Sequence, residues 1–165
     1  MTQPKAKPGT LLTRALFLAL VGVLSGVVVN SLRPDGIPWV YAWSAHVEVR
    51  TLQAQMAIAT VDEVAEATHT GSHIILDARS SDEFHRGAIP GAISLPFGNV
   101  EQAFPEVQLF LFEEQPIITY CSGPTCDEAL LLGLFLRDQG YTNVAVYVAG
   151  FEEWDALGHP VEGRR

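Results

Sequence analysis

Residues 116–126 read Pro-Ile-Ile-Thr-Tyr-Cys-Ser-Gly-Pro-Thr-Cys and join an apolar run to a short loop. The run that ends at Tyr120 is too short for a helix and is typical of a strand buried in a parallel sheet. The stretch from Asp127 to Gln139 is strongly helical, and Gly140 is a typical helix stop. The sequence therefore predicts a strand, a loop and a helix in succession, with Cys121 at the end of the strand.

The same alternation of short apolar runs and helical stretches extends in both directions along the chain. Thr60 and Glu63 have the spacing of a capping box, and Ser80 or Ser81 can cap a second, short helix. Strands that alternate with helices form a mostly parallel sheet covered on both faces, so we expect an α/β fold with ligands bound beyond the carboxyl ends of the strands. The expected strands are 74–76, 92–95, 116–120 and 143–148, and the expected helices are 60–71, 80–87, 100–111, 127–139 and 152–157.

The composition limits the domain organisation and the partners. A chain of 165 residues holds one ordinary domain and a short appendage, and 48% hydrophobic against 18% charged residues excludes a disordered chain. The net charge is −9, but residues 1–36 carry four basic side chains and one acidic one, so the rest of the chain carries −12. A surface of that sign repels phosphates, so nucleic acid is not an expected partner.

An 18-residue stretch near the N-terminus, Ala15 to Leu32, contains no formal charge and is long enough for a helix to cross most of a bilayer. Basic residues precede it and aromatic residues follow it, which favours a cytoplasmic N-terminus. A cleaved signal peptide is the main alternative, because small residues precede Ala45, although that site lies far beyond the apolar run. A buried core helix is the third. We expect a cytoplasmic tail at 1–14, a transmembrane anchor at 15–32, an interfacial linker at 33–59 and the α/β domain at 60–165.

Cys121 is the candidate nucleophile. A loop between a buried strand and a helix N-terminus can direct backbone N–H groups toward an anion, and a thiol placed there is open to activation. The alternative is a buried cysteine that acts as a small hydrophobic residue.

Several short motifs follow one another in order along the chain. They are Asp77-Ala78-Arg79, Glu83-Phe84, Gly87-Ala88-Ile89-Pro90-Gly91-Ala92, the Cys121 loop, Val148-Ala149-Gly150-Phe151, Trp154 and Gly158-His159-Pro160-Val161. With these motifs the chain resembles, from about Val61 to Val161, a rhodanese domain with a three-layer α/β/α fold. The resemblance implies that Cys121 carries a persulfide, taking sulfane sulfur from a donor and passing it to an acceptor such as a thiol or cyanide. It also implies that backbone amides of the loop cradle this sulfur, from Ser122, Gly123, Pro124, Thr125 and Cys126.

With its apolar N-terminal segment, the chain also resembles membrane-bound single-domain rhodanese-like proteins of bacteria. That likeness implies a single-pass protein of the inner membrane whose domain faces the periplasm.

The loop departs from the family pattern. Cys126 stands where many active rhodaneses have an arginine or lysine that holds thiosulfate. Gly123 comes one position early, and Ala88 replaces a common histidine. The fold also resembles cell-cycle dual-specificity phosphatases, but Asp127 stands where those proteins need an arginine. We therefore expect no phosphatase activity on aryl phosphates.

Charged residues near the loop have both structural and functional interpretations. Asp127 is expected to cap the following helix, and with Glu128 it adds negative charge that offsets activation of the thiol. Asp77 and Arg79 are expected to brace the strand end as a hydrogen-bonded pair, while contact with substrate stays open. The five histidines lack metal-ligand spacing, so neither a metal nor another cofactor is expected.

Three functions fit the sequence. The first is a sulfurtransferase or persulfide carrier that uses Cys121. The second is a redox module in which Cys121 and Cys126 cycle between dithiol and disulfide, and the third is a non-catalytic domain that binds a partner protein. Cys126 either resolves a Cys121 persulfide or packs with its sulfur turned away; a bridge needs Cα atoms within about 7 Å.

Overall fold

The computed structural model of the chain describes residues 8–33, 43–112 and 114–163. The chain divides into two units, Met1–Tyr41 and Ala42–Arg165.

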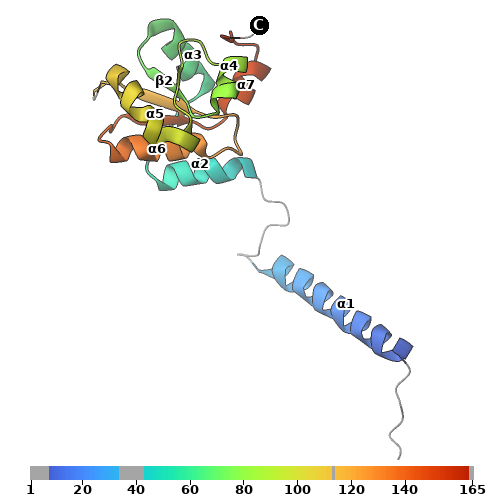
Figure 1. Ribbon diagram of the computed structural model, residues 1–165. Helices are drawn as coiled ribbons and strands as arrows, with labels where there is room; N and C mark the ends of the chain where they lie inside the picture. The colour runs from blue at the N-terminus through green and yellow to red at the C-terminus, as the bar shows by residue number, and fades with distance from the viewer. Residues whose placement is uncertain (1–7, 34–42, 113, 164–165) are drawn as a thin grey trace, which may run out of the picture. The chain divides into compact units, whose positions relative to one another are not determined.

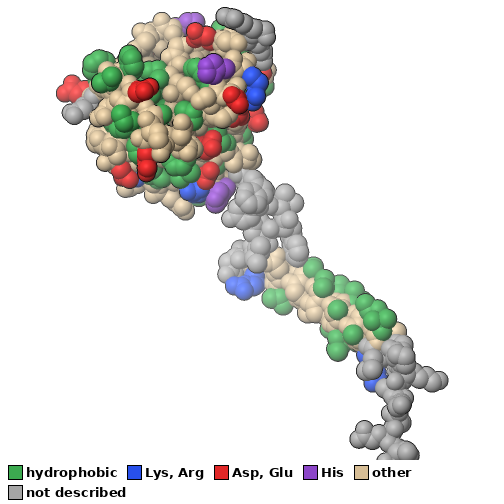
Figure 2. Space-filling view, viewed as in Figure 1, with side chains coloured by type: hydrophobic (Ala, Val, Ile, Leu, Met, Phe, Trp, Pro, Cys, Tyr) green, Lys and Arg blue, Asp and Glu red, His purple; other side chains and the backbone are tan. Residues whose placement is uncertain are grey.

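The first unit contains one long helix, α1 (Pro8–Leu32), which begins seven residues before the predicted span. Its stretch Leu12–Leu32 has a mean hydropathy of 2.2, no part of it is buried, and 21 residues rise about 32 Å as a helix. Figure 2 shows hydrophobic side chains along its length. By length and composition this helix can cross a membrane.

The second unit is built on five parallel strands, which confirms the prediction of an α/β fold with a parallel sheet. β4 pairs with β2 on one side and β5 on the other, so it is the central strand. The carboxyl end of this central strand leads directly into Cys121. In spatial order the strands are β1 (Ala57–Ile58), β5 (Val144–Tyr147), β4 (Ile117–Tyr120), β2 (Ile74–Asp77) and β3 (Ile93–Ser94).

Helices cover both faces of this sheet and form the outer layers of a three-layer fold (Figure 1). One face packs against α2 (Trp43–Gln53), α5 (Val100–Val107) and α6 (Glu128–Asp138). The other packs against α3 (Val61–Thr70) and α7 (Gly150–Ala156). The short helix α4 (Ser81–Arg86) follows β2, and two 3₁₀ turns, Phe97–Asn99 and Gln108–Phe110, flank α5.

Capping signals in the sequence place the starts of α3 and α4 correctly, whereas α7, expected over 152–157, begins at Gly150. Thr60 and Glu63 form the predicted capping box, and Ser80 and Glu83 form the equivalent box before α4, so Ser80 is the cap rather than Ser81. The helix expected over 100–111 is shorter, because α5 ends at Val107 and continues as a 3₁₀ turn.

The prediction of an interfacial linker at 33–59 is wrong for residues 43–59, which the structure describes. Val47 and Thr51 of α2 are buried, and β1 adds a strand to the sheet edge by pairing with β5. The α/β unit therefore begins before residue 60. Most of the aromatic residues expected at the membrane interface lie outside the described residues.

Candidate active site

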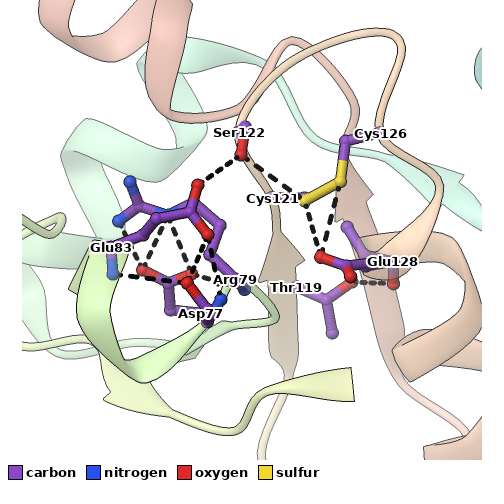
Figure 3. Close-up of a disulfide and its surroundings, with 10 residues drawn as sticks. Asp77, Arg79, Glu83, Thr119, Cys121, Ser122, Cys126 and Glu128 are labelled. Carbon is purple, nitrogen blue, oxygen red and sulfur yellow. Dashed lines mark hydrogen bonds and ion pairs between the residues drawn. A yellow bond between two sulfur atoms is a disulfide. The ribbon is translucent and has the colours of Figure 1, made fainter. Parts of the chain in front are cut away.

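Cys121 and Cys126 are joined by a disulfide across the loop between β4 and α6 (Figure 3). Their Cα atoms are 6.2 Å apart, within the range that a bridge needs. Cys121 is 2% exposed, whereas Cys126 is half-buried. The interpretation in which the Cys126 sulfur turns away is therefore wrong, because the loop brings the two sulfurs together.

A tight turn gives the loop its shape. The Cys126 N–H donates to the Gly123 carbonyl at 3.0 Å, and Pro124 occupies the second position of the turn, where its fixed φ is favourable. Pro124 has no N–H, and that of Cys126 is already bonded. The amide cradle inferred over residues 122–126 is thus reduced to Ser122, Gly123 and Thr125 as candidates.

The N-terminus of α7 holds the loop in place. The Phe151 N–H donates to the Cys121 carbonyl at 2.9 Å, and the Glu152 N–H donates to the Ser122 carbonyl at 2.8 Å. Gly150 makes this approach possible: its φ is +65°, and a Cβ there would lie 2.5 Å from the Cys121 oxygen. Gly150 is part of a motif that carries the family resemblance, but the sequence does not reveal its contact with the Cys121 loop.

Glu128, in the first turn of α6, contacts the disulfide directly. Its Oε2 lies 3.4 Å from the Cys121 Sγ and 3.7 Å from the Cys126 Sγ (Figure 3). Burial raises the pKa of Glu128, and the carboxylates of Glu83, Asp127 and Asp77 raise it further. The sequence indicates a negative charge at Glu128 near the thiol, but it does not indicate contact with the sulfurs, because that distance depends on the loop path.

Ser122 links the loop to α4. Its Oγ lies 4.0 Å from the Cys121 Sγ and donates to the Glu83 Oε1 at 3.3 Å. Hydrogen bonding from the Ser80 hydroxyl is the main cause that lowers the pKa of Glu83, so this carboxyl is held as an anion. The capping box of α4 thus positions a fixed negative charge near the loop.

Asp77 and Arg79 form a buried pair at the carboxyl end of β2. The Arg79 Nη2 lies 2.6 Å from Asp77 Oδ2 and donates to the Gly87 carbonyl at 2.8 Å. Tyr120 donates its hydroxyl proton to the same carboxylate, and the guanidinium lies 4.1 Å from the centre of the Phe151 ring. Arg79 is 4% exposed, so the pair braces the strand ends, as the sequence analysis expected.

Asp127 occupies the N-cap position of α6, but its side chain makes no capping hydrogen bond, which corrects the expected role. Its carboxylate instead accepts a hydrogen bond from Arg50 of α2 at 2.8 Å. The start of α6 is fixed from the sheet side by Thr119, whose hydroxyl donates to the Ala129 carbonyl at 2.9 Å.

The ligand atoms of Cys121, Cys126 and Glu128 lie within 4.8 Å of one another, a grouping that sequence spacing did not suggest. Because the sulfurs are bonded to each other, this arrangement offers no thiolate to a metal ion. The expectation of no metal stays a prediction.

Two of the curated relatives with a similar sequence are sulfurtransferases by name. A thiosulfate sulfurtransferase of Actinobacillus succinogenes is 28% identical over 103 residues, covering 62% of this chain and 87% of the relative. A putative mitochondrial thiosulfate sulfurtransferase of Schizosaccharomyces pombe is 32% identical over 94 residues, covering 50% of this chain and 63% of the relative.

Solved structures share the fold. A Bacillus halodurans protein superposes with a TM-score of 0.60 at 24% identity, covering 73% of this chain and 86% of that chain. A thiosulfate sulfurtransferase from Pseudomonas aeruginosa gives a TM-score of 0.59 at 23% identity, covering 74% of this chain and 23% of that chain. The family model of the rhodanese-like domain matches residues 60–157. This match covers more than half of the sequence and includes the Cys121 loop, so the chain belongs to the rhodanese-like domain family.

Proposed function

We propose that this protein is a membrane-anchored sulfurtransferase in which Cys121 accepts sulfane sulfur as a persulfide and Cys126 resolves it. The observation that carries the proposal is the Cys121–Cys126 bond at the carboxyl end of the central strand. The loop cysteine matches the family's nucleophile position, and the second cysteine replaces the usual loop cation. The relatives named as sulfurtransferases support the same chemistry.

The reaction has three balanced steps. The Cys121 thiolate attacks the terminal sulfur of a persulfide donor, the donor's S–S bond breaks, and the donor leaves as a thiol. The Cys126 thiolate then attacks the Cys121 Sγ and expels hydrosulfide with the electron pair, which leaves the disulfide. An external dithiol reduces this disulfide and becomes a disulfide itself.

Charge near the loop favours particular donors. Asp127 and Glu128 lie at the start of α6, directly after Cys126, the position at which a family arginine would hold thiosulfate. Glu83 adds a third carboxylate beside Ser122. Carboxylates repel a dianion such as thiosulfate. The donors that fit are persulfides and polysulfides of small thiols, with a thiol or dithiol as the acceptor.

Intact mass measurements on the reduced full chain in detergent test the sulfur chemistry. Wild type, Cys121→Ser and Cys126→Ser are each incubated with cysteine persulfide, a polysulfide or thiosulfate, and released sulfide is quantified. We expect Cys126→Ser to gain sulfur on Cys121, wild type to end as the disulfide with one sulfide released per chain, and Cys121→Ser to gain none.

The same experiment separates the alternatives. Oxidation of wild type to the disulfide without release of sulfide indicates a thiol–disulfide redox module, the second candidate that the bridge supports. No mass gain on Cys121 with any donor, together with no disulfide cycling, indicates a non-catalytic domain that binds a partner protein.

The proposed location is the inner membrane, with one span and the domain in the periplasm. The length and hydropathy of α1 support a span, and its serine hydroxyls are satisfied within the helix: Ser25 donates to the Val21 carbonyl and Ser31 to the Val27 carbonyl. A disulfide also fits an oxidising compartment.

A reporter fused after Arg165 tests this topology. It should be active only outside the cytoplasm, and a cytoplasmic signal contradicts the orientation. The intact mass of the membrane-extracted protein separates a retained anchor from a cleaved signal peptide, because cleavage removes the mass of the N-terminal segment.

A further inference from the structure

We propose that Glu128 is a catalytic acid and base of the thiol–disulfide step. Its carboxyl gives a proton to the sulfur that leaves when the Cys121–Cys126 bond is reduced, and it takes a proton back when the bond re-forms. The inference rests on the proposed function, because this bond must be reduced before Cys121 can accept sulfur again.

The contact geometry places one oxygen within reach of both reacting sulfurs. Glu128 Oε2 lies 3.4 Å from the Sγ of Cys121 and 3.7 Å from that of Cys126. Neither sulfur of a disulfide carries a proton. Of these three side chains, only a protonated Glu128 can therefore donate a hydrogen bond. The contact is attractive when the carboxyl is neutral and unfavourable when it is a carboxylate.

The surroundings keep Glu128 protonated to a higher pH than an ordinary glutamate. Its side chain is partly buried, and negative groups face it from neighbouring elements: Glu83 of α4, Asp77 of β2 and the adjacent Asp127. The nearby cations are engaged elsewhere, since Arg79 pairs with Asp77 and Arg50 pairs with Asp127. Burial and the three carboxylates together raise the pKa of Glu128.

Exposure sets the direction of reduction. Cys126 is the more exposed of the two cysteines, so the thiolate of an external dithiol attacks its Sγ. The disulfide breaks, its electron pair goes to the Cys121 Sγ, and the Glu128 proton passes to that sulfur. The second thiol of the reductant then attacks the mixed disulfide and its proton passes to the departing Cys126 sulfur, so Cys126 is released as a thiol while the reductant closes to a cyclic disulfide.

The return step uses the same group in reverse. After reduction Glu128 is a carboxylate within reach of both cysteines. When Cys121 carries a persulfide, Glu128 takes the proton from the Cys126 thiol, and the resulting thiolate attacks the Cys121 Sγ. Hydrosulfide leaves with the electron pair, and Glu128 is protonated again. One carboxyl thus serves both halves of the cycle.

Reduction kinetics of the Glu128→Gln variant test this role. The oxidised full chain in detergent is reduced with dithiothreitol at a series of pH values, and the reduced fraction is counted by alkylation and intact mass. The wild-type rate is divided by the variant rate at each pH. Because the thiolate fraction of dithiothreitol is the same for both proteins, this ratio does not depend on the ionisation of the reagent. We expect a ratio of about one hundred at low pH, at the low end of general acid catalysis, falling toward one as pH rises through the pKa of Glu128.

Glu66→Gln is the matched control, because Glu66 is an exposed acid on α3 and the change removes the same charge. Its ratio should stay near one at every pH. A ratio for Glu128→Gln that does not vary with pH indicates a structural role and overturns the proposal.

Infrared difference spectra of the wild-type chain provide an independent test. The band of a protonated carboxyl should be present in the oxidised state, disappear on reduction, and be missing from Glu128→Gln. Absence of the band in oxidised wild type overturns the proposal, even where the variant fails to fold.

Failure of sulfur transfer is distinguishable from failure of this inference, since the reduction assay uses no sulfur donor. A pH-dependent ratio without persulfide formation supports Glu128 in a dithiol–disulfide module and contradicts sulfur transfer. A flat ratio with normal persulfide formation contradicts only the role of Glu128.

Discussion

Arg50 of α2 donates a hydrogen bond to the carboxylate of Asp127 at 2.8 Å, across 77 positions of sequence. The contact ties the first helix of the α/β unit to the start of α6, one residue before Glu128. It offsets one of the negative charges that act on Glu128. A helix that sequence analysis did not predict therefore contributes to the electrostatics of the candidate site.

Substitution of Arg50 should change the pH dependence of disulfide reduction more than the free energy of unfolding. The side chains of Arg50 and Asp127 are 35% and 45% exposed, so a double-mutant cycle with Arg50→Ala and Asp127→Ala should give a coupling free energy below about 1 kcal/mol. In Arg50→Ala, the unpaired Asp127 should raise the pKa of Glu128 further and move the midpoint of the pH-dependent reduction rate upward. Arg86→Ala, on the surface of α4, is the control; an equal shift there contradicts a local effect.

Gly150 should tolerate alanine poorly. Its φ of +65° disfavours any other residue, and an added Cβ would also lie 2.5 Å from the Cys121 carbonyl oxygen and 2.9 Å from the Gly123 nitrogen. Gly158 is the matched control, because its φ is +76° and a Cβ there meets nothing within 4 Å. Gly158→Ala should lower the free energy of unfolding by about 1 kcal/mol, the strain alone.

Gly150→Ala should cost about 1–3 kcal/mol more than Gly158→Ala, because backbone must move, and it should also change the rate of disulfide reduction. Denaturant unfolding of both variants in detergent measures the first effect and the alkylation assay the second. Equal losses of stability and unchanged kinetics contradict the view that Gly150 positions the loop.

The sequence predicts those elements whose signals are local. The capping boxes at Thr60 and Ser80 and the apolar runs of β2, β4 and β5 are each read from a few neighbouring residues. The strand β1 has only two residues and forms because β5 offers a free edge, so no local pattern reveals it. The position of α2 likewise depends on packing, with Val47 buried against the sheet.

The features of the candidate site also fall into those that local sequence predicts and those that depend on the folded chain. Cys121 was identified from its place between a strand and a helix, and the pairing of Asp77 with Arg79 from their spacing at a strand end. The bridge to Cys126 depends on a Cα distance, which sequence does not give. The contacts of Glu128 with the sulfurs and of Asp127 with Arg50 depend on how α6 begins, and they appear only once the loop is folded.

The buried pair of Asp77 and Arg79 should cost more stability when one partner is removed than when both are replaced. Arg79→Met leaves the Asp77 carboxylate buried without its cation, which should cost about 3–5 kcal/mol in the free energy of unfolding. The double variant Asp77→Leu with Arg79→Met should recover much of this loss, because no unpaired charge remains. Chemical unfolding of both proteins measures the difference.

The same variants decide whether Arg79 has a second role at the sheet edge. If the double variant is folded and still forms the Cys121 persulfide, Arg79 acts only as a brace. A folded double variant that takes up no sulfur, while keeping its disulfide chemistry, contradicts this and indicates contact with the donor.

Cys126→Ser should lengthen the lifetime of the Cys121 persulfide. In wild type the resolving thiol lies on the same loop, with Cα atoms 6.2 Å apart, so its attack is intramolecular and fast compared with that of a dilute external thiol. A serine hydroxyl does not displace hydrosulfide at neutral pH, so the persulfide should persist until an acceptor arrives, at least about tenfold longer. Intact mass at timed intervals after removal of the donor measures the decay. Cys126→Ala should behave like Cys126→Ser, since both lack the thiol, whereas a lifetime equal to that of wild type, with no loop disulfide in non-reduced peptide maps, contradicts a resolving role for Cys126.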